Sequence, residues 1–302
     1  TFIRTTYGIR CYPVETLMIR TRFAPSPTGP LHLGHAYSAI TAHDFARTHK
    51  GQFLLRIEDI DQSRARTTWE NQIYDDLAWL GLTWDGQVMR QSQRTTAYST
   101  ALNQLWDAGL IYCCTCSRRD IVQASSAPQE GLSAQHTGPD GLIYPGSCRS
   151  SIKDRVWIND AALRINISEA LKGHNSVTFK NIESDINRPV FYIKDNLQMT
   201  DFIGDFVVSR RVNEAAYHLA VVVDDTAQAI THVVRGEDLK SATPIHILLQ
   251  RLLGHPSPTY MHHPLIRDDA GKRLAKRDDA KAIGKFRAEG ASPANIRAMI
   301  GL

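Results

Sequence analysis

The chain has 302 residues, of which 42% are hydrophobic and 22% charged, proportions typical of a globular protein with a sizeable core. Its formal net charge of +4 permits a polyanionic partner without requiring one. No apolar run is long enough to span a membrane, and no internal repeat stands out, which excludes membrane-spanning and repeat architectures. An odd number of cysteines, five, argues against a disulfide framework and favours a reducing, cytoplasmic compartment.

Residues 1–17 are expected to form an N-terminal extension that precedes the folded unit. Met18 looks like the usual first residue, so an upstream start explains the segment best. An organellar transit peptide is the alternative, but the segment lacks a clear amphipathic pattern.

The first hundred residues after Met18 predict alternating strands and helices. An apolar and basic segment at 19–24 predicts a strand, residues 36–50 a helix that Gly51 ends, and residues 52–57 a second, buried strand. Strand, helix and strand within about forty residues form a βαβ unit and therefore a parallel sheet. Apolar residues at helical spacing predict two further helices, at 67–80 and 96–108.

The composition changes at residues 113–150, which hold four of the five cysteines. A stretch rich in Ser, Ala, Gly and Pro at 123–141 predicts an irregular loop, and the region as a whole a small inserted domain. The elements expected after it are strands at 156–167, 177–179, 191–193 and 202–208, a helix at 215–223, and a strand at 230–234 whose end delivers Arg235.

These elements predict an α/β protein with an insertion. Its expected parts are the extension 1–17, the first half of a catalytic domain at 18–112, an inserted subdomain at 113–190, and the second half of the catalytic domain with a short helical tail at 191–302. Arg22, Glu58 and Arg235 all fall at the carboxyl ends of predicted strands, where ligands gather in open α/β sheets.

Two short stretches predict a nucleotide-activating site. Residues 25–35 (PSPTGPLHLGH) place a Pro/Gly-rich turn between a strand and a helix, whose N-terminal N–H groups suit phosphates. His32 and His35 could donate hydrogen bonds to phosphate oxygens, and Gly34 lets a flat ring such as adenine approach the backbone. The second stretch is a basic loop at 272–277, from which Lys276 could reach the same triphosphate.

The two stretches resemble the HIGH and KMSKS motifs of class I aminoacyl-tRNA synthetases. Four further blocks resemble the glutamyl branch: 22–29 (RFAPSPTG), 55–59 (LRIED), 216–225 (AYHLAVVVDD) and 234–239 (VRGEDL). Six blocks in the right order, over roughly residues 18–285, make a specific signal. The resemblance implies a Rossmann-type catalytic domain that converts L-glutamate and ATP into glutamyl-adenylate, with His32, His35 and Lys276 as catalytic residues and with Gly34 also at the ATP.

The basic loop departs from the family pattern. Ala275 stands where the family usually has serine, and Arg277 follows the lysine. The charge survives while one hydroxyl is lost, which puts the rate rather than the reaction in doubt. Mg²⁺ is expected with ATP, and its ligands cannot be assigned from the sequence.

Glutamate carries two carboxylates and one ammonium, so a selective site needs cations and an anion. Arg22 and Arg235 suit the carboxylates because a guanidinium can bind one with two bonds, and Glu58 suits the ammonium. The resemblance implies the following glutamate-binding positions: Arg22, Phe23, Ala24, Pro25, Ser26, Glu58, Tyr217 and Arg235. The alternative reading makes the arginines surface residues, Glu58 an ordinary salt-bridge partner and Tyr217 a core residue.

The cysteines resemble the family's zinc site. The resemblance implies a structural Zn²⁺ held by Cys114, Cys116, Tyr144 and Cys148, a closed tetrahedral set with no position left for water. Cys113 is one residue out of phase and should point away. Two alternatives are buried thiols without metal and His136 as the fourth ligand.

The acceptor is inferred from the length of the chain. Only 25 residues follow Arg277, whereas an anticodon-reading domain needs on the order of 100. The chain therefore resembles the truncated paralogues of the glutamyl branch, the glutamyl-queuosine tRNA(Asp) synthetases, which esterify glutamate to queuosine in the anticodon of tRNA(Asp). The resemblance implies tRNA(Asp) bearing queuosine as partner, and a monomer is expected.

Two other functions stay open. One is a glutamyl-tRNA synthetase that charges the acceptor end of tRNA(Glu), and the other is a synthetase-like binding protein without catalysis. Basic residues around the insertion are either a tRNA-facing surface or an ordinary solvated face: Arg118, Arg119, Arg149, Lys153 and Arg155.

Overall fold

The computed structural model describes residues 18–125, 137–149, 156–211, 214–266 and 281–302. The predicted N-terminal extension lies outside the described residues. So do Lys276 and the rest of the basic loop, the alternative ligand His136, and Lys153 and Arg155.

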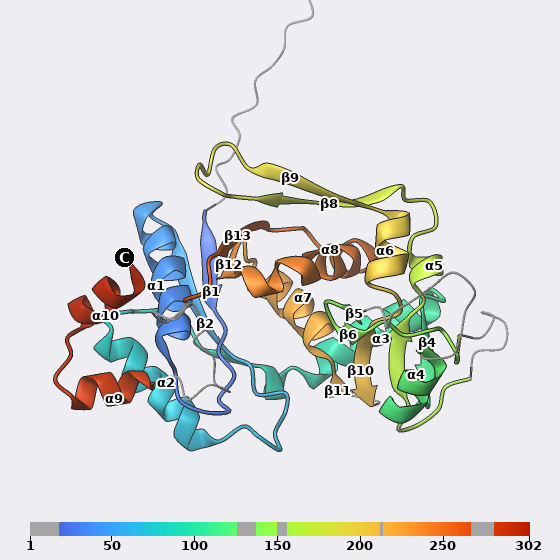
Figure 1. Cartoon of the computed structure of the whole chain (residues 1–302), viewed down its shortest axis with the longest axis horizontal. Helices are drawn as coiled ribbons and strands as arrows, with labels where there is room; N and C mark the ends of the chain where they lie inside the picture. Colours follow the sequence, from blue (N-terminus) through green and yellow to red (C-terminus); the bar gives the residue numbers. More distant parts are fainter. Residues whose placement is uncertain (1–17, 126–136, 150–155, 212–213, 267–280) are drawn as a thin grey trace, which may run out of the picture.

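A parallel sheet forms one half of the molecule (Figure 1). β1 (Arg20–Phe23) pairs with β2 (Gln52–Ile57), and β2 with β3 (Met89–Arg90), both in parallel. On the other side of β1 lies β12 (His232–Gly236), because the Thr231 N–H donates to the Arg20 carbonyl at 3.0 Å. β12 pairs in parallel with β13 (Thr259–His263). The predicted βαβ unit and its parallel sheet are thereby confirmed.

The remaining strands extend this arrangement and add a second sheet. β8 (Ser176–Asn181) follows β13 and pairs antiparallel with β9 (Val190–Asp195). The second sheet has the order β11-β10-β7-β4 and lies at the other end of the molecule (Figure 1). Its strands are β4 (Ile111–Cys114), β7 (Ala162–Ile165), β10 (Val207–Arg211) and β11 (Glu214–Ala215). The second sheet thus joins segments from before, within and after residues 113–190, and the limits of the inserted subdomain stay a prediction.

The helices cover the sheets and close two hydrophobic cores. One core lies under α1 (Leu33–Thr48) and α2 (Thr67–Trp79) and is completed by α9 (Ile283–Ala288) and α10 (Pro293–Ile300). The other joins α3 (Thr95–Asp107), α7 (Tyr217–Ala227) and α8 (Thr243–Leu252) to the second sheet and to β8. Within the described part of the chain, no helix is long and apolar enough to cross a membrane.

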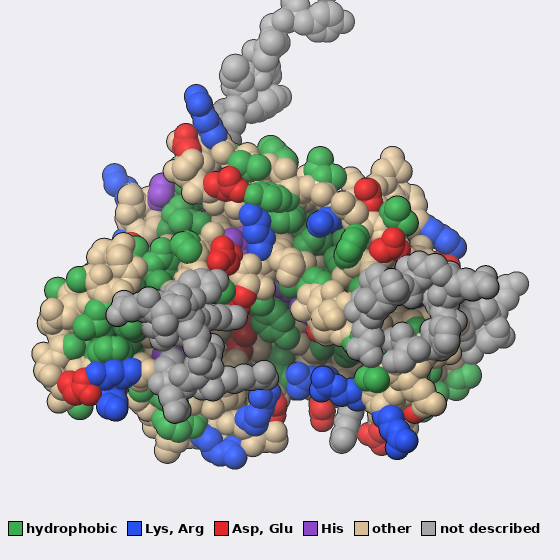
Figure 2. Space-filling model, viewed as in Figure 1, with side chains coloured by type: hydrophobic (Ala, Val, Ile, Leu, Met, Phe, Trp, Pro, Cys, Tyr) green, Lys and Arg blue, Asp and Glu red, His purple; other side chains and the backbone are tan. Residues whose placement is uncertain are grey.

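Most of the shorter elements lie at the same end of the molecule as the second sheet. They are α4 (Arg118–Ser125), the hairpin of β5 (Thr137–Gly138) and β6 (Gly141–Leu142), α5 (Ile167–Ala170), α6 (Asn196–Phe202) and the 3₁₀ helices Gln91–Gln93 and Glu237–Ala242. Exposed apolar side chains gather on the outer strand β9, and Figure 2 shows hydrophobic side chains along that upper margin of the face.

The structure corrects several predicted elements. Residues 123–125 belong to α4 rather than to a loop, and residues 156–161 form no strand because Asp160 has a positive φ. Residues 202–206 are not a strand either, since α6 ends at Phe202 and Gly204 turns the chain at φ 65°. Helix α7 begins at Tyr217, after β11, and not at residue 215. Arg235 lies inside β12 rather than beyond its end.

Helix α1 begins three residues earlier than predicted because a histidine caps it. The Gly34 N–H donates to His32 Nδ1 at 3.1 Å, and the His32 N–H donates to His35 Nδ1 at 3.2 Å. Capping patterns are dominated by Ser, Thr, Asp and Asn, so two imidazoles in these roles escape a sequence reading.

The connection from α1 to β2 requires glycine at position 51. A Cβ there would stand 2.2 Å from the Ile19 carbonyl oxygen, which itself accepts the Gln52 N–H. We predict that Gly51→Ala destabilises the protein by about 1–3 kcal/mol, since the clash is with backbone and cannot be relieved by a side-chain rotation. Urea unfolding measures it, with the exposed Thr48→Ala as control. Equal stability of the two variants would contradict this close approach.

Candidate active site

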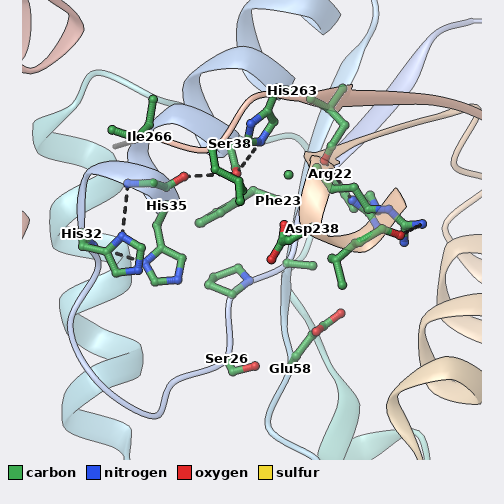
Figure 3. Close-up of a pocket in the computed structure, with 18 of the residues that line it drawn as sticks. Arg22, Phe23, Ser26, His32, His35, Ser38, Glu58, Asp238, His263 and Ile266 are labelled. Atoms are coloured by element: carbon green, nitrogen blue, oxygen red, sulfur yellow. Dashed lines mark hydrogen bonds between the residues drawn. The ribbon is translucent and has the colours of Figure 1, made fainter. Parts of the chain in front are cut away.

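A pocket of about 450 Å³ opens at the carboxyl ends of β1, β2 and β12 (Figure 3). Turn 24–32, the N-terminus of α1 and the first residue of α7 complete its wall. The structure brings together in this pocket all the predicted glutamate and ATP residues that it describes: Arg22, Phe23, Ala24, Pro25, Ser26, His32, Gly34, His35, Glu58, Tyr217 and Arg235. Lys276 lies outside the described residues, so its place stays a prediction.

The two histidines of the turn are held in one tautomer. Their rings are 3.8 Å apart between centroids and lie next to each other at the α1 N-terminus (Figure 3). Each Nδ1 accepts a backbone N–H, so a neutral ring carries its proton on Nε2. Both histidines are therefore prepared as Nε2–H donors, at a helix end that favours anions.

Asp225 binds two buried arginines beneath the pocket. Its carboxylate accepts from Arg22 Nε at 3.0 Å and Nη2 at 3.3 Å, and from Arg56 Nη1 at 2.6 Å. Burial alone would raise the pKa of Asp225, but Arg22 and Arg56 hold that pKa below its usual value. Arg22 is thus buried and not on the surface, and it shares the carboxylate of Asp225 with Arg56.

Glu58 faces the pocket from the end of β2. Arg56 Nη2 donates to it at 3.2 Å. Burial raises the pKa of Glu58, and the neighbouring Arg56 and Arg22 oppose that rise only in part. A further cation beside Glu58, such as an amino acid's ammonium, would favour its ionised form.

Arg235 is a buried cation that neutral groups hold in place. Its Nη1 donates to His246 Nδ1 at 2.9 Å, its Nη2 to Thr243 Oγ1 at 2.8 Å, and its Nε to His262 Nε2 at 3.2 Å. Within the described part of the chain no carboxylate lies within ion-pair distance of this guanidinium, although the residue is only 5% exposed. An uncompensated buried charge is costly, which is typical of a binding site whose ligand supplies the counter-charge.

The two histidines beside Arg235 stay neutral. Burial, then the charge of Arg235, lowers the pKa of His262 to about 3 and that of His246 well below its usual value. His262 also has its Nδ1 2.6 Å from Asn181 Oδ1, which must accept, so the imidazole donates there and receives Arg235 on Nε2. Neither ring competes with a ligand carboxylate for the charge of Arg235.

Apart from the separate ion pair of Asp224 with Arg94, the buried charges at the base of the pocket sum to one positive charge. Three guanidiniums, those of Arg22, Arg56 and Arg235, face two carboxylates, those of Asp225 and Glu58. Glutamate has two carboxylates and one ammonium, hence one net negative charge, and would neutralise the set. His246, His262, Arg56 and Asp225 were missed as site residues. Arg56 and Asp225 stand inside the blocks at 55–59 and 216–225, but no local pattern in those blocks marks them as site residues.

A second cluster lies at the other end of the molecule. The Sγ atoms of Cys114, Cys116 and Cys148 all lie within 4.8 Å of one another, and Tyr144 Oη is 3.3 Å from Cys116 Sγ. Arg164 stacks over the Tyr144 ring at 4.1 Å. Cys113 points away as predicted, into the other core, where its Sγ accepts the Ile158 N–H. Three thiols and a phenol thus converge as a tetrahedral metal site requires, and the cluster can hold a metal ion.

A histidine pair at a helix N-terminus beside an amino-acid-sized, cation-rich pocket, on a parallel sheet, places the chain in the class of α/β proteins with a ligand site at the strand ends. Comparison with known families agrees with that class. The family "tRNA synthetases class I (E and Q), catalytic domain" matches residues 18–302. The chain belongs to this family and is a class I aminoacyl-tRNA synthetase ligase, so the predicted fold class and the resemblance to the glutamyl branch are confirmed.

Individual relatives show which members of the family this chain resembles in sequence and in structure. A curated protein of Rhodobacter capsulatus named glutamyl-Q tRNA(Asp) synthetase is 57% identical over 284 residues, which cover 93% of this chain and 99% of the relative. One of the same name from Geobacter sulfurreducens is 40% identical over 88% of this chain and 78% of the relative. A glutamate tRNA ligase structure from Elizabethkingia meningosepticum superposes with a TM-score of 0.69 at 24% identity. The superposition covers 93% of this chain but only 60% of that ligase.

We predict that His246→Glu weakens glutamate activation much more than His246→Gln. A carboxylate at position 246 would pair with Arg235 and cancel the charge that awaits the ligand, whereas glutamine offers a neutral acceptor. The Michaelis constant for glutamate in ATP–pyrophosphate exchange should rise by roughly 30-fold or more relative to the glutamine variant. If both variants behave alike, the charge of Arg235 does not govern binding.

Proposed function

We propose that this enzyme activates L-glutamate with ATP and transfers it to queuosine in the anticodon loop of tRNA(Asp). The observation that carries the first step is the buried Arg235, which lacks a counter-charge among the described residues. The acceptor is proposed from the curated relatives named glutamyl-Q tRNA(Asp) synthetase, one of which this chain covers almost entirely.

In the proposed complex Arg235 pairs with the side-chain carboxylate of glutamate, and Glu58 receives the ammonium. Ser26 and Tyr217 add neutral hydrogen bonds, and Arg22 stays on Asp225 and lends its charge to the reacting carboxylate. Glutamine would leave Arg235 unpaired in a buried site, so it should be a poor substrate.

The activation step needs positioning and charge stabilisation only. An oxygen of the glutamate α-carboxylate attacks the α-phosphorus of ATP, the new P–O bond forms, and pyrophosphate leaves with the electron pair of the broken bond. His32 and His35 donate from Nε2 to phosphate oxygens beside the α1 N-terminus, Gly34 leaves room for adenine, and Lys276 stabilises pyrophosphate. Mg²⁺ accompanies ATP in this proposal.

The cysteine cluster is proposed to hold one structural Zn²⁺ through Cys114, Cys116, Tyr144 and Cys148. Burial and the neighbouring thiols raise the pKa of Tyr144, so its ionised form requires a cation beside it. The bound ion would tie β4 to residues 144–148 and supply folding energy rather than chemistry.

We predict one zinc per chain, reduced to well below half an equivalent in Cys148→Ser. Elemental analysis measures the content, and Cys113→Ser is the matched control, because Cys113 faces the other core. Removal of the metal by a chelator should leave the α1 half of the molecule folded and expose residues 137–149 to proteases first. Full metal content in Cys148→Ser would remove the proposed ligand set.

The acceptor is tested with labelled glutamate, ATP and two tRNA preparations. We predict that tRNA containing queuosine accepts glutamate even after its 3′ CCA end has been removed enzymatically, and that the product is an alkali-labile ester. Queuosine-free tRNA with an intact 3′ end is the control and should accept none. Labelling that requires an intact 3′ end, and ignores queuosine, would instead assign the enzyme to acceptor-end charging.

A further inference from the structure

A second cavity of about 420 Å³ adjoins the pocket of Figure 3 and has no role so far. Tyr217, Asp238 and Leu239 line both cavities, so the two share a wall. The turn of the β5–β6 hairpin, at Pro139 and Asp140, closes its other side. We call this second cavity the hairpin pocket. A molecule held in it would lie beside whatever Tyr217 contacts in the first pocket.

The lining of the hairpin pocket suits a hydroxyl-bearing ring better than a phosphate chain. Its floor is small and apolar, with Val207, Ala216 and Ala242, against which a flat ring could lie. Asp140 presents a carboxylate that is 42% exposed, and a carboxylate accepts hydrogen bonds from hydroxyls but repels phosphates. The volume falls within the range of small-ligand sites, about 300–1,000 Å³.

Two hydrogen bonds connect the cation of the glutamate pocket to His218, whose Nε2 lies at ion-pair distance from Asp140. Arg235 can only donate, so His246 Nδ1 accepts and the His246 proton lies on Nε2. That Nε2 is 3.0 Å from His218 Nδ1, which must then accept, so the His218 proton lies on Nε2. His218 Nε2 in turn is 3.4 Å from Asp140 Oδ1.

The two hydrogen bonds determine which nitrogen of His218 faces the carboxylate of Asp140. The donor in each is determined by Arg235, so the proton of His218 lies on Nε2, the ring atom 3.4 Å from one oxygen of Asp140. The other oxygen of Asp140 is the natural acceptor for a hydroxyl in the hairpin pocket. Arg210, on β10, lines the same cavity and is 62% exposed, where it could contact a phosphate of a polynucleotide backbone.

We propose that the hairpin pocket binds the hydroxyl-bearing ring of the tRNA acceptor and that Asp140 orients its nucleophilic hydroxyl. The inference rests on the proposed function. In the transfer step the hydroxyl oxygen bonds to the glutamyl carbonyl carbon, the bond from that carbon to the phosphate oxygen breaks, and AMP leaves with the electron pair and takes up the hydroxyl proton. Asp140 holds the hydroxyl through a hydrogen bond and is a positioning residue.

The test compares transfer with activation in Asp140→Asn. We expect the rate of glutamate transfer to tRNA, divided by the rate of glutamate-dependent pyrophosphate exchange, to fall by about 10-fold or more. Asp140→Glu keeps the carboxylate and should recover part of that ratio. Asp201→Asn, an exposed carboxylate on α6, is the matched control. Arg210→Gln should raise the Michaelis constant for tRNA without changing the one for glutamate.

Each other result overturns the proposal. A ratio in Asp140→Asn within about two-fold of the Asp201→Asn ratio means that no acceptor group rests on Asp140. An exchange rate that falls together with transfer means that Asp140 serves the glutamate pocket through His218. Wild-type enzyme without glutamate-dependent exchange would instead refute the proposed function itself.

The two possible sources of the hydroxyl are separated by the substrate. Queuosine-containing tRNA without its 3′ CCA end offers only the hydroxyls of the modified base as a charging site, whereas queuosine-free tRNA with an intact end offers only the terminal ribose. The defect of Asp140→Asn should appear with the first substrate. A defect confined to the second would place the terminal ribose in the hairpin pocket.

Discussion

The site depends on a guanidinium that neutral groups hold in place of a carboxylate. Arg235 is buried and donates hydrogen bonds to four acceptors, which are two imidazoles, a hydroxyl and the Leu239 carbonyl. These acceptors satisfy the N–H groups of Arg235 but carry no negative charge, so among the described residues its positive charge has no ion-pair partner. Each imidazole is kept neutral by burial and by the arginine itself, so neither imidazole adds a charge beside Arg235.

Asp225 has the opposite surroundings to Arg235, because this buried carboxylate is bound directly by two charged arginines. It binds both Arg22 and Arg56, and in doing so fastens α7 to β1 and β2. Tyr217 is the first residue of α7 and lines the pocket. The carboxylate of Asp225 therefore also positions Tyr217 relative to β1 and β2. Loss of Asp225 would leave the buried Arg22 without a carboxylate partner and Arg56 with Glu58 alone, a strongly destabilising change of about 3–5 kcal/mol. Loss of the neutral partners of Arg235 would change its position more than its charge. Stability and selectivity thus come from different neighbours.

Much of this could be predicted from the sequence because the strong signals are local. The strand at 52–57 and the helices at 67–80 and 96–108 were recovered within one residue, since their apolar periodicity is regular. Turn 25–35 and residues Glu58 and Arg235 were recognised as parts of one pocket from strand ends and motif blocks. The elements at 156–161 and 202–206 failed because apolar content there was read without the positive φ of Asp160 and Gly204.

The partners of the recognised residues could not be predicted. Arg235 meets His246 and His262 across 11 and 27 residues of chain, and Arg22 meets Asp225 across 203. Such pairs are set by packing, and no local pattern marks which histidine will be neutral. The hairpin pocket could not be predicted for the same reason, because Asp140 lies inside a stretch whose composition predicted only an irregular loop.

The central claim is that the buried charge of Arg235 selects a side-chain carboxylate. Calorimetric titration of the enzyme with glutamate and with glutamine, in the absence of ATP and tRNA, tests it directly. The two ligands differ by one charged group at nearly constant shape. Glutamate should bind at least about 30-fold more tightly, the equivalent of roughly 2 kcal/mol. Equal dissociation constants for the two amino acids would contradict it.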